Sequence, residues 1–226
     1  MVQLSDIHHG LYTRLEEVER AVELANHLEP DLVALTGDFV TSSRKYIAPM
    51  ARALGRLKAR LGCYAVLGNH DHRVGADAVT AALETYGVEV LRNRHVRLRR
   101  NGSSLVVAGV DDLGYGQDNL RLALQGAIAD TATVLLCHNP AVLPGAAACG
   151  VDLVLSGHTH GGQVDAPRLR SAMHLRAPQR FRHGWEQVGG TQLYISRGIG
   201  TVVFPFRLRC PAEIPVLHLQ ADARAA

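Results

Sequence analysis

The sequence predicts an α/β protein that forms one domain over residues 1–226. Short apolar runs alternate with segments of helical periodicity, which is typical of α/β proteins. With 47% hydrophobic and 20% charged residues, the composition is globular, and the length suits a single domain with a sizeable core. Five of the apolar runs are followed directly by residue types that bind metal ions. The predicted sheet would therefore carry a functional site at one edge.

Helical periodicity begins near the amino terminus. Thr13 and Glu16 fit the capping-box pattern, apolar residues then recur at helical spacing, and Pro30 ends the segment. Four further helices are expected, and a glycine marks the end of the first two of them. Their approximate ranges are 47–62, 77–87, 120–127 and 141–147.

Strands are expected where short apolar runs lack helical periodicity. The pair Asn101-Gly102 predicts a β-hairpin that joins residues 96–100 to residues 105–110. The segment 165–186 is rich in Arg and Pro and predicts a long surface loop. The other expected strands cover residues 2–5, 31–36, 64–67, 134–137, 152–156, 193–196 and 214–219.

Polar residues after five of these strands form the candidate site. Ligand-binding residues gather at the carboxyl ends of strands in α/β sheets, so these groups are expected to meet in one cleft. Side chains two apart in an extended segment face the same way, so Asp6 and His8 can both face one ion, and His158 and His160 can do likewise. A glycine before three of the groups permits a sharp turn. The groups are Asp6 and His8; Asp38; Asn69, His70 and Asp71; His138 and Asn139; and His158 and His160.

The chemistry of these residues points to a transition-metal site. Carboxylate, amide and imidazole donors without thiolate suit manganese, iron, zinc, cobalt or nickel, whereas magnesium or calcium would not need so many histidines. The four cysteines form no C-x-x-C pair, which argues against a thiolate zinc site or a disulfide framework. The donors outnumber the needs of one tetrahedral ion, but two ions that share a carboxylate would use them all. Such a pair can activate water for attack on a phosphate ester.

The blocks D-x-H, G-D, G-N-H-D, a lone H and G-H-x-H occur in that order, each after an expected strand. In this respect the sequence resembles the calcineurin-like metallophosphoesterase family. Residues 157–164 and 196–200, with Pro211–Ile214, look like the YkuE/YaeI-type phosphodiesterase branch. The resemblance covers nearly the whole chain. It implies a four-layer α/β/β/α sandwich, in which two mixed β-sheets are flanked by helices.

The same resemblance implies a role for each motif residue. His70 would lie beside the substrate phosphate and assist the leaving group without binding metal, and Asp71 would orient it through a hydrogen bond. A hydroxide that bridges two divalent ions, with manganese expected first, would attack the phosphorus of a phosphodiester. The first ion would take Asp6, His8 and His160, the second Asn69, His138 and His158, and Asp38 would bridge them.

Several residues near the motifs admit two interpretations. Asn139 would either bind phosphate or cap the turn before Pro140, and Arg197 would either bind phosphate or form a structural pair at a strand end. His9 and His72 are interpreted as rim residues, because the ligand sets are already full. The arginines of two further segments are interpreted as solvated charges, although those of the long loop would also suit an anionic substrate or lipid surface. They are Arg92, Arg94, Arg97, Arg99 and Arg100 in the hairpin region, and Arg168, Arg170, Arg176, Arg180 and Arg182 in the loop.

The substrate class stays open at this stage between a small-molecule and a lipid-linked phosphate ester. The alternatives are a phosphomonoesterase, a nucleotide-lipid (UDP-diacylglucosamine-type) pyrophosphatase, and a non-catalytic protein-binding scaffold on the same fold. A nucleic-acid module is not expected, since the net charge is only +3 and 5% of the residues are aromatic. Without a leader or a run of about eighteen apolar residues, the sequence as written predicts a cytoplasmic protein. A missing leader would instead make it membrane-associated or exported, and the oligomeric state is undetermined.

Overall fold

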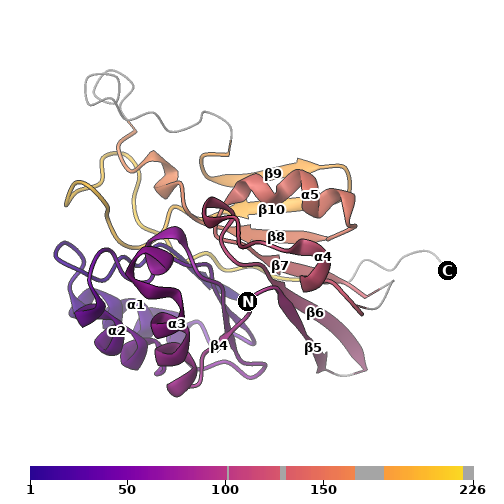
Figure 1. Cartoon of the computed structure of the whole chain (residues 1–226), viewed down its shortest axis with the longest axis horizontal. Coiled ribbons are helices and arrows are strands. Elements are labelled where there is room, and N and C mark those ends of the chain that lie inside the picture. Colours follow the sequence, from indigo (N-terminus) through magenta and orange to yellow (C-terminus); the bar gives the residue numbers. More distant parts are fainter. Residues whose placement is uncertain (101, 128–130, 166–180, 221–226) are drawn as a thin grey trace.

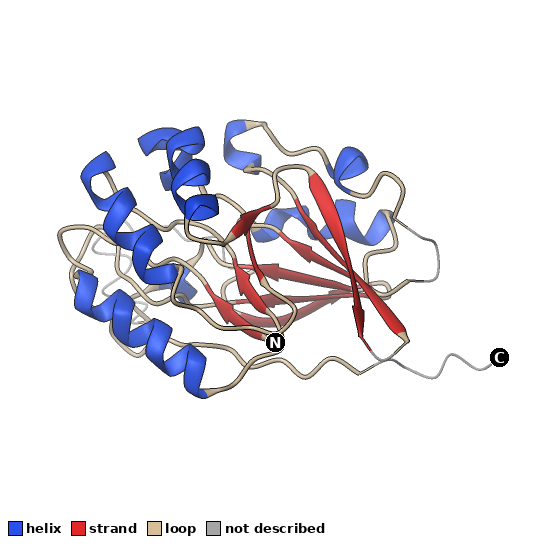
Figure 2. Ribbon diagram, turned by 90° about the horizontal axis from the view of Figure 1, so that it is seen from below, coloured by secondary structure: helices blue, strands red, loops and turns tan. Residues whose placement is uncertain are grey.

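The computed structural model describes residues 1–100, 102–127, 131–165 and 181–220. Two β-sheets lie against each other, and helices cover their outer faces (Figures 1 and 2). The strand order is β1-β2-β3-β4 in the first sheet and β5-β6-β7-β8-β10-β9 in the second. The predicted α/β sandwich of two sheets flanked by helices is confirmed.

The two sheets differ in strand direction. All described strand pairs of the first sheet are parallel, so the expectation that this sheet is mixed is wrong. The second sheet is mixed, because β5 and β6, and β9 and β10, pair in antiparallel fashion. The first sheet consists of β1 (Val2–Leu4), β2 (Val33–Leu35), β3 (Cys63–Ala65) and β4 (Glu89–Val90). The second consists of β5 (Arg94–Arg100), β6 (Ser103–Gly109), β7 (Thr133–Leu136), β8 (Leu153–Ser156), β9 (Gly184–Val188) and β10 (Thr191–Ile195).

The helices are divided between the two outer faces. Three lie against the first sheet and two shorter ones against the second. The first group is α1 (Leu15–His27), α2 (Ile47–Leu54) and α3 (Asn69–Thr85), and the second is α4 (Leu120–Ala123) and α5 (Leu143–Ala148). Single 3₁₀ turns occur at Arg44–Tyr46, Leu113–Tyr115, Pro140–Val142 and His160–Gly162.

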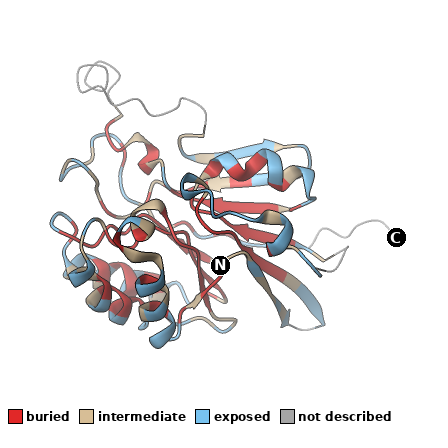
Figure 3. Ribbon diagram, viewed as in Figure 1, coloured by how far each residue is buried: buried red, intermediate tan, exposed pale blue. Residues whose placement is uncertain are grey.

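Three apolar layers hold this arrangement together. Val22 and Met50 pack between the first sheet and its helices, and Leu143 packs between the second sheet and α5. The third layer lies between the sheets, where Val66 of one side meets Leu136 of the other. Figure 3 shows the buried strands at the centre and the exposed outer faces of the helices. Burial of these layers excludes water from the middle of the molecule and fixes how the two sheets meet.

The helix boundaries differ from the sequence expectations in three places. The backbone N–H of Arg14, not of Thr13, bonds the side chain of Glu17 at 2.7 Å, so the capping interaction is displaced by one residue. The second helix ends at Leu54 rather than near residue 62. The third begins at Asn69 and is kinked at Gly75, where φ is +135°. Its second half coincides with the expected segment.

The expected strand at 214–219 is absent from the described residues. This segment runs beside β1 and makes only an isolated bridge between Val216 and Val2. Pro215 lacks an N–H group, which limits pairing, although its carbonyl accepts from Gln3 N at 3.0 Å. The strands β4 and β9 were not expected. The predicted hairpin is confirmed, although Asn101 of its turn lies outside the described residues. Most of the expected long loop also lies outside the described residues.

Candidate metal centre

The five ligand-bearing segments meet where the carboxyl ends of β1, β2 and β3 face those of β7 and β8. Hydrogen bonds join the two sheets at this junction. His138 Nδ1 lies 2.8 Å from the carbonyl oxygen of Thr36, and Gln3 Nε2 donates to the carbonyl oxygen of Ser156 at 2.9 Å. The parallel strands therefore bring together residues that are more than 100 positions apart in the chain.

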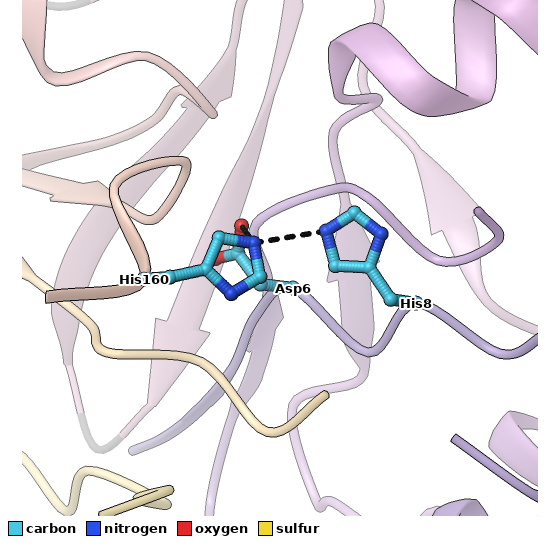
Figure 4. Close-up of side chains that lie close together, drawn as sticks. All are labelled: Asp6, His8 and His160. Atoms are coloured by element: carbon cyan, nitrogen blue, oxygen red, sulfur yellow. Dashed lines mark hydrogen bonds and ion pairs between the residues drawn. The ribbon is translucent and has the colours of Figure 1, made fainter. Parts of the chain in front are cut away.

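One group of donors consists of Asp6, His8 and His160 (Figure 4). The Nε2 atoms of His8 and His160 lie 3.0 Å apart, and His160 Nε2 lies 3.3 Å from Asp6 Oδ1. All three side chains are buried, and their ligand atoms lie within 4.8 Å of one another. This spacing is suited to a single cation held by two imidazoles and one carboxylate.

A second group lies on the other side of Asp38. The Nδ1 atom of His158 lies 3.1 Å from Asn69 Oδ1 and 3.2 Å from His138 Nε2. The structure thus brings together all three residues that were assigned to the second ion. His138 is fully buried, whereas His158 is exposed and borders the open side of the site.

Asp38 lies between the two groups. Its Oδ2 atom is 3.3 Å from His8 Nε2 and 3.3 Å from His138 Nε2. Its other oxygen accepts the backbone N–H of His70 at 2.8 Å. One carboxylate oxygen is therefore equidistant from a donor of each group.

The backbone at these donors is in an unusual conformation. Asp6, His8, Asp38, His158 and His160 all have a positive φ, between +49° and +71°. Such values are uncommon outside glycine, and they cluster at functional sites when the surrounding structure enforces them. The D-x-H and H-x-H segments were expected to be extended, and this expectation is wrong. Left-handed backbone conformations direct the side chains of both pairs into the site.

Two glycines are required by close packing around the carboxylates. A Cβ atom on Gly157 would collide with Ser5 Oγ and Asp6 Oδ2, and one on Gly68 would collide with Asp38 Oδ1. Neither position has the positive φ of a glycine turn, so the requirement is steric. The two acidic donors thus explain why these positions require glycine.

The electrostatics of the site favour bound cations. Burial alone would raise the pKa of Asp38, but the charges and hydrogen bonds of His138 and His8 hold it well below its usual range. Burial would lower the pKa of His138, yet Asp38 raises it to about 10. Burial lowers the pKa of His160 to about 3. The buried carboxylates of Asp6 and Asp38 thus require nearby positive charge, and His160 offers an unprotonated nitrogen.

The donor set fits a pair of divalent ions. Three pairs of donor atoms face each other at 3.0–3.2 Å: His8 with His160, His138 with His158, and Asn69 with His158. Facing nitrogens can share at most one proton, whereas a cation placed between them would satisfy both lone pairs. Each group supplies three nitrogen or oxygen donors, and Asp38 is available to both.

His70 borders the centre, but its partner is not the expected one. Its Nδ1 lies 2.8 Å from the carbonyl oxygen of Thr41, so Nδ1 carries the proton and Nε2 is free. Its ring lies edge-on to His8, with the centroids 4.7 Å apart. Burial lowers the pKa of His70. Because its ring nitrogen also lies within 4.8 Å of donor atoms of His8 and Asp38, it is close enough to serve the site.

The predicted hydrogen bond from Asp71 to His70 is not formed. Asp71 is fully buried and instead accepts the backbone N–H groups of Phe39, Val40 and Gly68, at 2.9, 3.3 and 2.9 Å. Burial and the charge of Asp38 raise its pKa to about 7. Asp71 therefore links the loop that follows β2 to the start of α3, because the backbone N–H groups there have no other acceptor.

The two expected substrate residues have structural partners. Arg197 lies 3.7 Å from Glu213, and its backbone N–H also bonds that carboxylate at 2.9 Å. Asn139 accepts the N–H of Ala141 at 3.0 Å and caps the following 3₁₀ turn. These contacts match the structural interpretations of both residues.

The histidines and arginines around the site have partners as well. His9 Nδ1 lies 3.0 Å from the carbonyl oxygen of Thr13, and His72 Nε2 lies 2.6 Å from Asp111 Oδ1. Arg92, expected on a solvated face, is half-buried and bonds Asp111 at 2.7 Å. The other hairpin arginines are exposed, and Arg182 pairs with Asp165. Arg168, Arg170, Arg176 and Arg180 lie outside the described residues.

Sequence reasoning missed several residues that support the centre. Ser5 Oγ donates to Asp6 Oδ2 at 2.6 Å. Arg207 donates to the carbonyl oxygens of Arg197 and Gly200 at 2.8 and 2.6 Å and lies 3.4 Å from that of His160. The position of Ser5, directly before Asp6, was a usable signal. Nothing in the irregular segment around Arg207 marked it.

Comparison with known proteins agrees with this geometry. The family described as calcineurin-like phosphoesterase matches residues 1–162, which include every candidate metal ligand. The chain belongs to the calcineurin-like phosphoesterase family. This membership implies a metal-dependent phosphoester hydrolase domain, and the donors of the candidate centre lie within the matched residues.

Similar metallophosphoesterases occur in distant organisms. The chain is 36% identical to a bovine transmembrane protein with a metallophosphoesterase domain, across 98% of the chain and 53% of that protein. It is 32% identical to metallophosphoesterase YkuE of Bacillus subtilis, across 98% of the chain and 79% of YkuE. It thus spans about half of the bovine relative. None of the described helices has the length and apolarity needed to cross a membrane.

Solved structures share the metallophosphoesterase fold. NAD nucleotidase of Haemophilus influenzae superposes with a TM-score of 0.58 and 16% identity, across 88% of the chain and 50% of that structure. The protein TT1561 of Thermus thermophilus gives a TM-score of 0.57 at 15% identity, across 88% of both chains. At such low identity these similarities establish the fold alone.

Proposed function

We propose that this metallophosphoesterase hydrolyses phosphodiesters with two divalent transition-metal ions. The observation that carries the proposal is the position of Asp38, whose Oδ2 atom lies 3.3 Å from both His8 and His138. It connects two groups of donors that could each hold one ion. Bound there, two ions would supply the hydroxide nucleophile and offset the charge on the phosphoryl oxygens.

The protein side chains would hold the ions and transfer the proton. The carboxylates of Asp6 and Asp38 and the four histidines in the two donor groups fix the centre against the junction of the sheets. His70 lies at its border with Nδ1 committed to the Thr41 carbonyl. Its Nε2 atom would donate a proton to the departing alkoxide from the imidazolium form of the ring, which returns to the neutral tautomer protonated on Nδ1.

The charge of the site supports a diester rather than a monoester. A phosphomonoester is a dianion near neutral pH, whereas a diester carries one negative charge. Among the described residues, two arginines beside the centre are already engaged, Arg197 with Glu213 and Arg207 with backbone carbonyls. Neither is free to bind the additional charge of a monoester.

The experiment compares model substrates with one or two ester bonds. Purified protein is stripped of metal, reloaded separately with manganese, iron, zinc, cobalt or nickel, and assayed on bis-p-nitrophenyl phosphate and p-nitrophenyl phosphate. The proposal predicts a larger kcat/KM for the diester. A larger value for the monoester would show a phosphomonoesterase. Cleavage only of a detergent-dispersed nucleotide-lipid diphosphate would show a pyrophosphatase.

An inactive variant is needed to exclude a contaminating phosphatase. Asp38→Asn removes the shared carboxylate and should abolish turnover under every metal. Asp77→Asn is a suitable control, since the side chain of Asp77 is 96% exposed and lies outside the candidate centre. Equal activity of Asp38→Asn and the parent would contradict the proposal. Equal absence of activity would indicate that the fold serves only as a protein-binding scaffold.

A further inference from the structure

An exposed apolar surface lies beside the first group of metal donors. Two loops form it, residues 10–13 after β1 and residues 201–209 near the carboxyl end. Thr201 N lies 3.4 Å from Thr13 Oγ1, which joins the loops, and both project at the same edge of the molecule (Figure 1). The most exposed members are Leu11 at 77% and Val203 at 63%. We define the apolar surface as Leu11, Tyr12, Val203, Phe206 and Leu208.

The second loop is held rigidly by one buried side chain. Gln163 Nε2 lies 3.0, 3.0 and 3.2 Å from the carbonyl oxygens of Val202, Phe204 and Phe206, and its Oε1 accepts the N–H of Val202 at 2.9 Å. The loop therefore turns its polar backbone inward around Gln163 and presents apolar side chains to solvent. An apolar protrusion built in this way is a fixed feature of the fold.

Val203 is placed against its own conformational preference. Its φ is +66°, a region that is strongly disfavoured for a β-branched residue and that glycine or asparagine adopts readily. Its side chain is exposed, so packing within the chain does not compensate for the strain. The strained backbone therefore presents an apolar side chain to solvent.

The surface is also connected to the metal centre. The loop leaves β10 beside Asp6, where Gly200 N donates to the Asp6 carbonyl oxygen at 2.8 Å. At its far end, Arg207 and Cys210 lie 3.4 and 3.2 Å from the carbonyl oxygen of His160. A surface bound to these side chains would thus lie directly beside the donors of the first ion.

The exposed charged residues that flank the apolar side chains are mostly basic. Arg14 and Arg209 follow the two loops directly, and Glu16 and Glu17 lie on the first turn of α1. Arg209 follows Leu208, and Lys45 lies over the ring of Tyr46, which itself contacts His9 beside the first loop. No described carboxylate lies within ion-pair distance of either cation. Apolar side chains between basic ones match an anionic lipid surface, where the former enter the headgroup region and the latter meet lipid charge. A symmetric contact between two copies would oppose cations of the same sign.

We infer that the apolar surface docks the protein onto an anionic membrane, with the metal centre facing the lipid headgroups. This binding does not depend on the proposed activity, because it is measured without turnover. The full chain is sedimented with vesicles of phosphatidylcholine alone and of phosphatidylcholine mixed with phosphatidylglycerol. The parent should bind the mixed vesicles and bind neutral ones much more weakly, with the difference lost in high salt.

Substitutions at exposed positions test the surface without disturbing the core. The triple variant Val203→Asn, Phe206→Ser, Leu208→Ser should bind the mixed vesicles at least about tenfold more weakly. Its matched control is Leu24→Ser with Leu28→Ser on and just after α1, where the side chains are 54% and 47% exposed and neither belongs to the apolar surface. The control should bind like the parent, and Arg209→Glu should weaken binding to mixed vesicles alone.

A separate measurement shows that any loss reflects contact rather than misfolding. Val203→Asn alone should unfold at the same or a higher temperature, because asparagine tolerates the left-handed backbone. Equal vesicle binding by the parent and the triple variant would overturn the inference, and so would a parent that binds neither vesicle. A parent that is dimeric by light scattering, with a monomeric triple variant, would overturn it in favour of a second copy.

Discussion

The carbonyl oxygen of Thr41 lies 2.8 Å from Nδ1 of His70 and fixes the orientation of that ring. A backbone acceptor therefore does what the carboxylate of Asp71 was expected to do. It holds the proton on Nδ1 and leaves Nε2 without a hydrogen-bond partner among the described residues. His70 is placed to transfer a proton without occupying a metal position.

His70→Ala tests this separation of roles. The variant should retain the metal content of the parent, since the two donor groups remain intact. Its kcat should fall by roughly a hundredfold or more, the usual effect of losing an acid–base group. Metal content is measured by elemental analysis and turnover on the diester. Full activity would exclude the proposed role, and loss of an ion would show that His70 binds metal.

Asp71 should contribute stability rather than chemistry. Asp71→Ala leaves three buried backbone N–H groups without their acceptor and should lower the free energy of unfolding by about 3 kcal/mol. Urea unfolding of the metal-free variant measures the loss. Asp77→Ala provides the control, because that side chain is 96% exposed and should change stability little. A stable variant with reduced kcat would instead support a catalytic role.

Gly157 should be intolerant of any side chain. In Gly157→Ala the new methyl group would collide with Ser5 and Asp6, so Asp6 must move away from His8 and His160. We expect weaker binding of one metal ion and at least about a tenfold loss of activity, as when a group that orients a ligand is removed. Gly190→Ala is the matched control, since a Cβ atom at that position would meet nothing within 4 Å. Similar behaviour of both variants would contradict the steric argument.

Asp111 should make stability depend on pH. Burial would raise its pKa, but His72 and Arg92 hold the pKa below its usual value. A carboxylate with a depressed pKa in the folded state stabilises the protein above about pH 4, and this contribution is lost as the pH falls further. Asp111→Asn should therefore be less stable than the parent by roughly 1–3 kcal/mol at neutral pH, and the difference should shrink in acid. A difference that grows in acid would contradict this assignment.

The sequence predicted most of the centre because its donors follow parallel strands in short, contiguous blocks. Once strands such as β1 and β2 are parallel, their carboxyl ends lie at one edge, so Asp6 and Asp38 must approach each other. The left-handed conformations of the donors were not predictable in this way. They depend on hydrogen bonds between segments, such as His8 N with the carbonyl oxygen of Asp38.

Other features could not be read from residue types. Every residue has a carbonyl, so nothing distinguished Thr41 as the partner of His70. The carboxyl-terminal loop has no periodicity, and its conformation depends on Gln163 from a distant segment. The capping interaction at Glu17 rather than Glu16 reflects a one-residue shift in where the backbone becomes helical.

The most direct test of the account is the number of metal ions that the protein binds. Metal-free protein is dialysed against manganese, and bound metal per chain is measured for the parent, His158→Ala and Asp38→Ala. The account predicts two ions in the parent, one in His158→Ala, and weakened binding of both in Asp38→Ala. A parent that saturates with a single ion, or an Asp38→Ala variant that still binds two, would contradict the central position of Asp38.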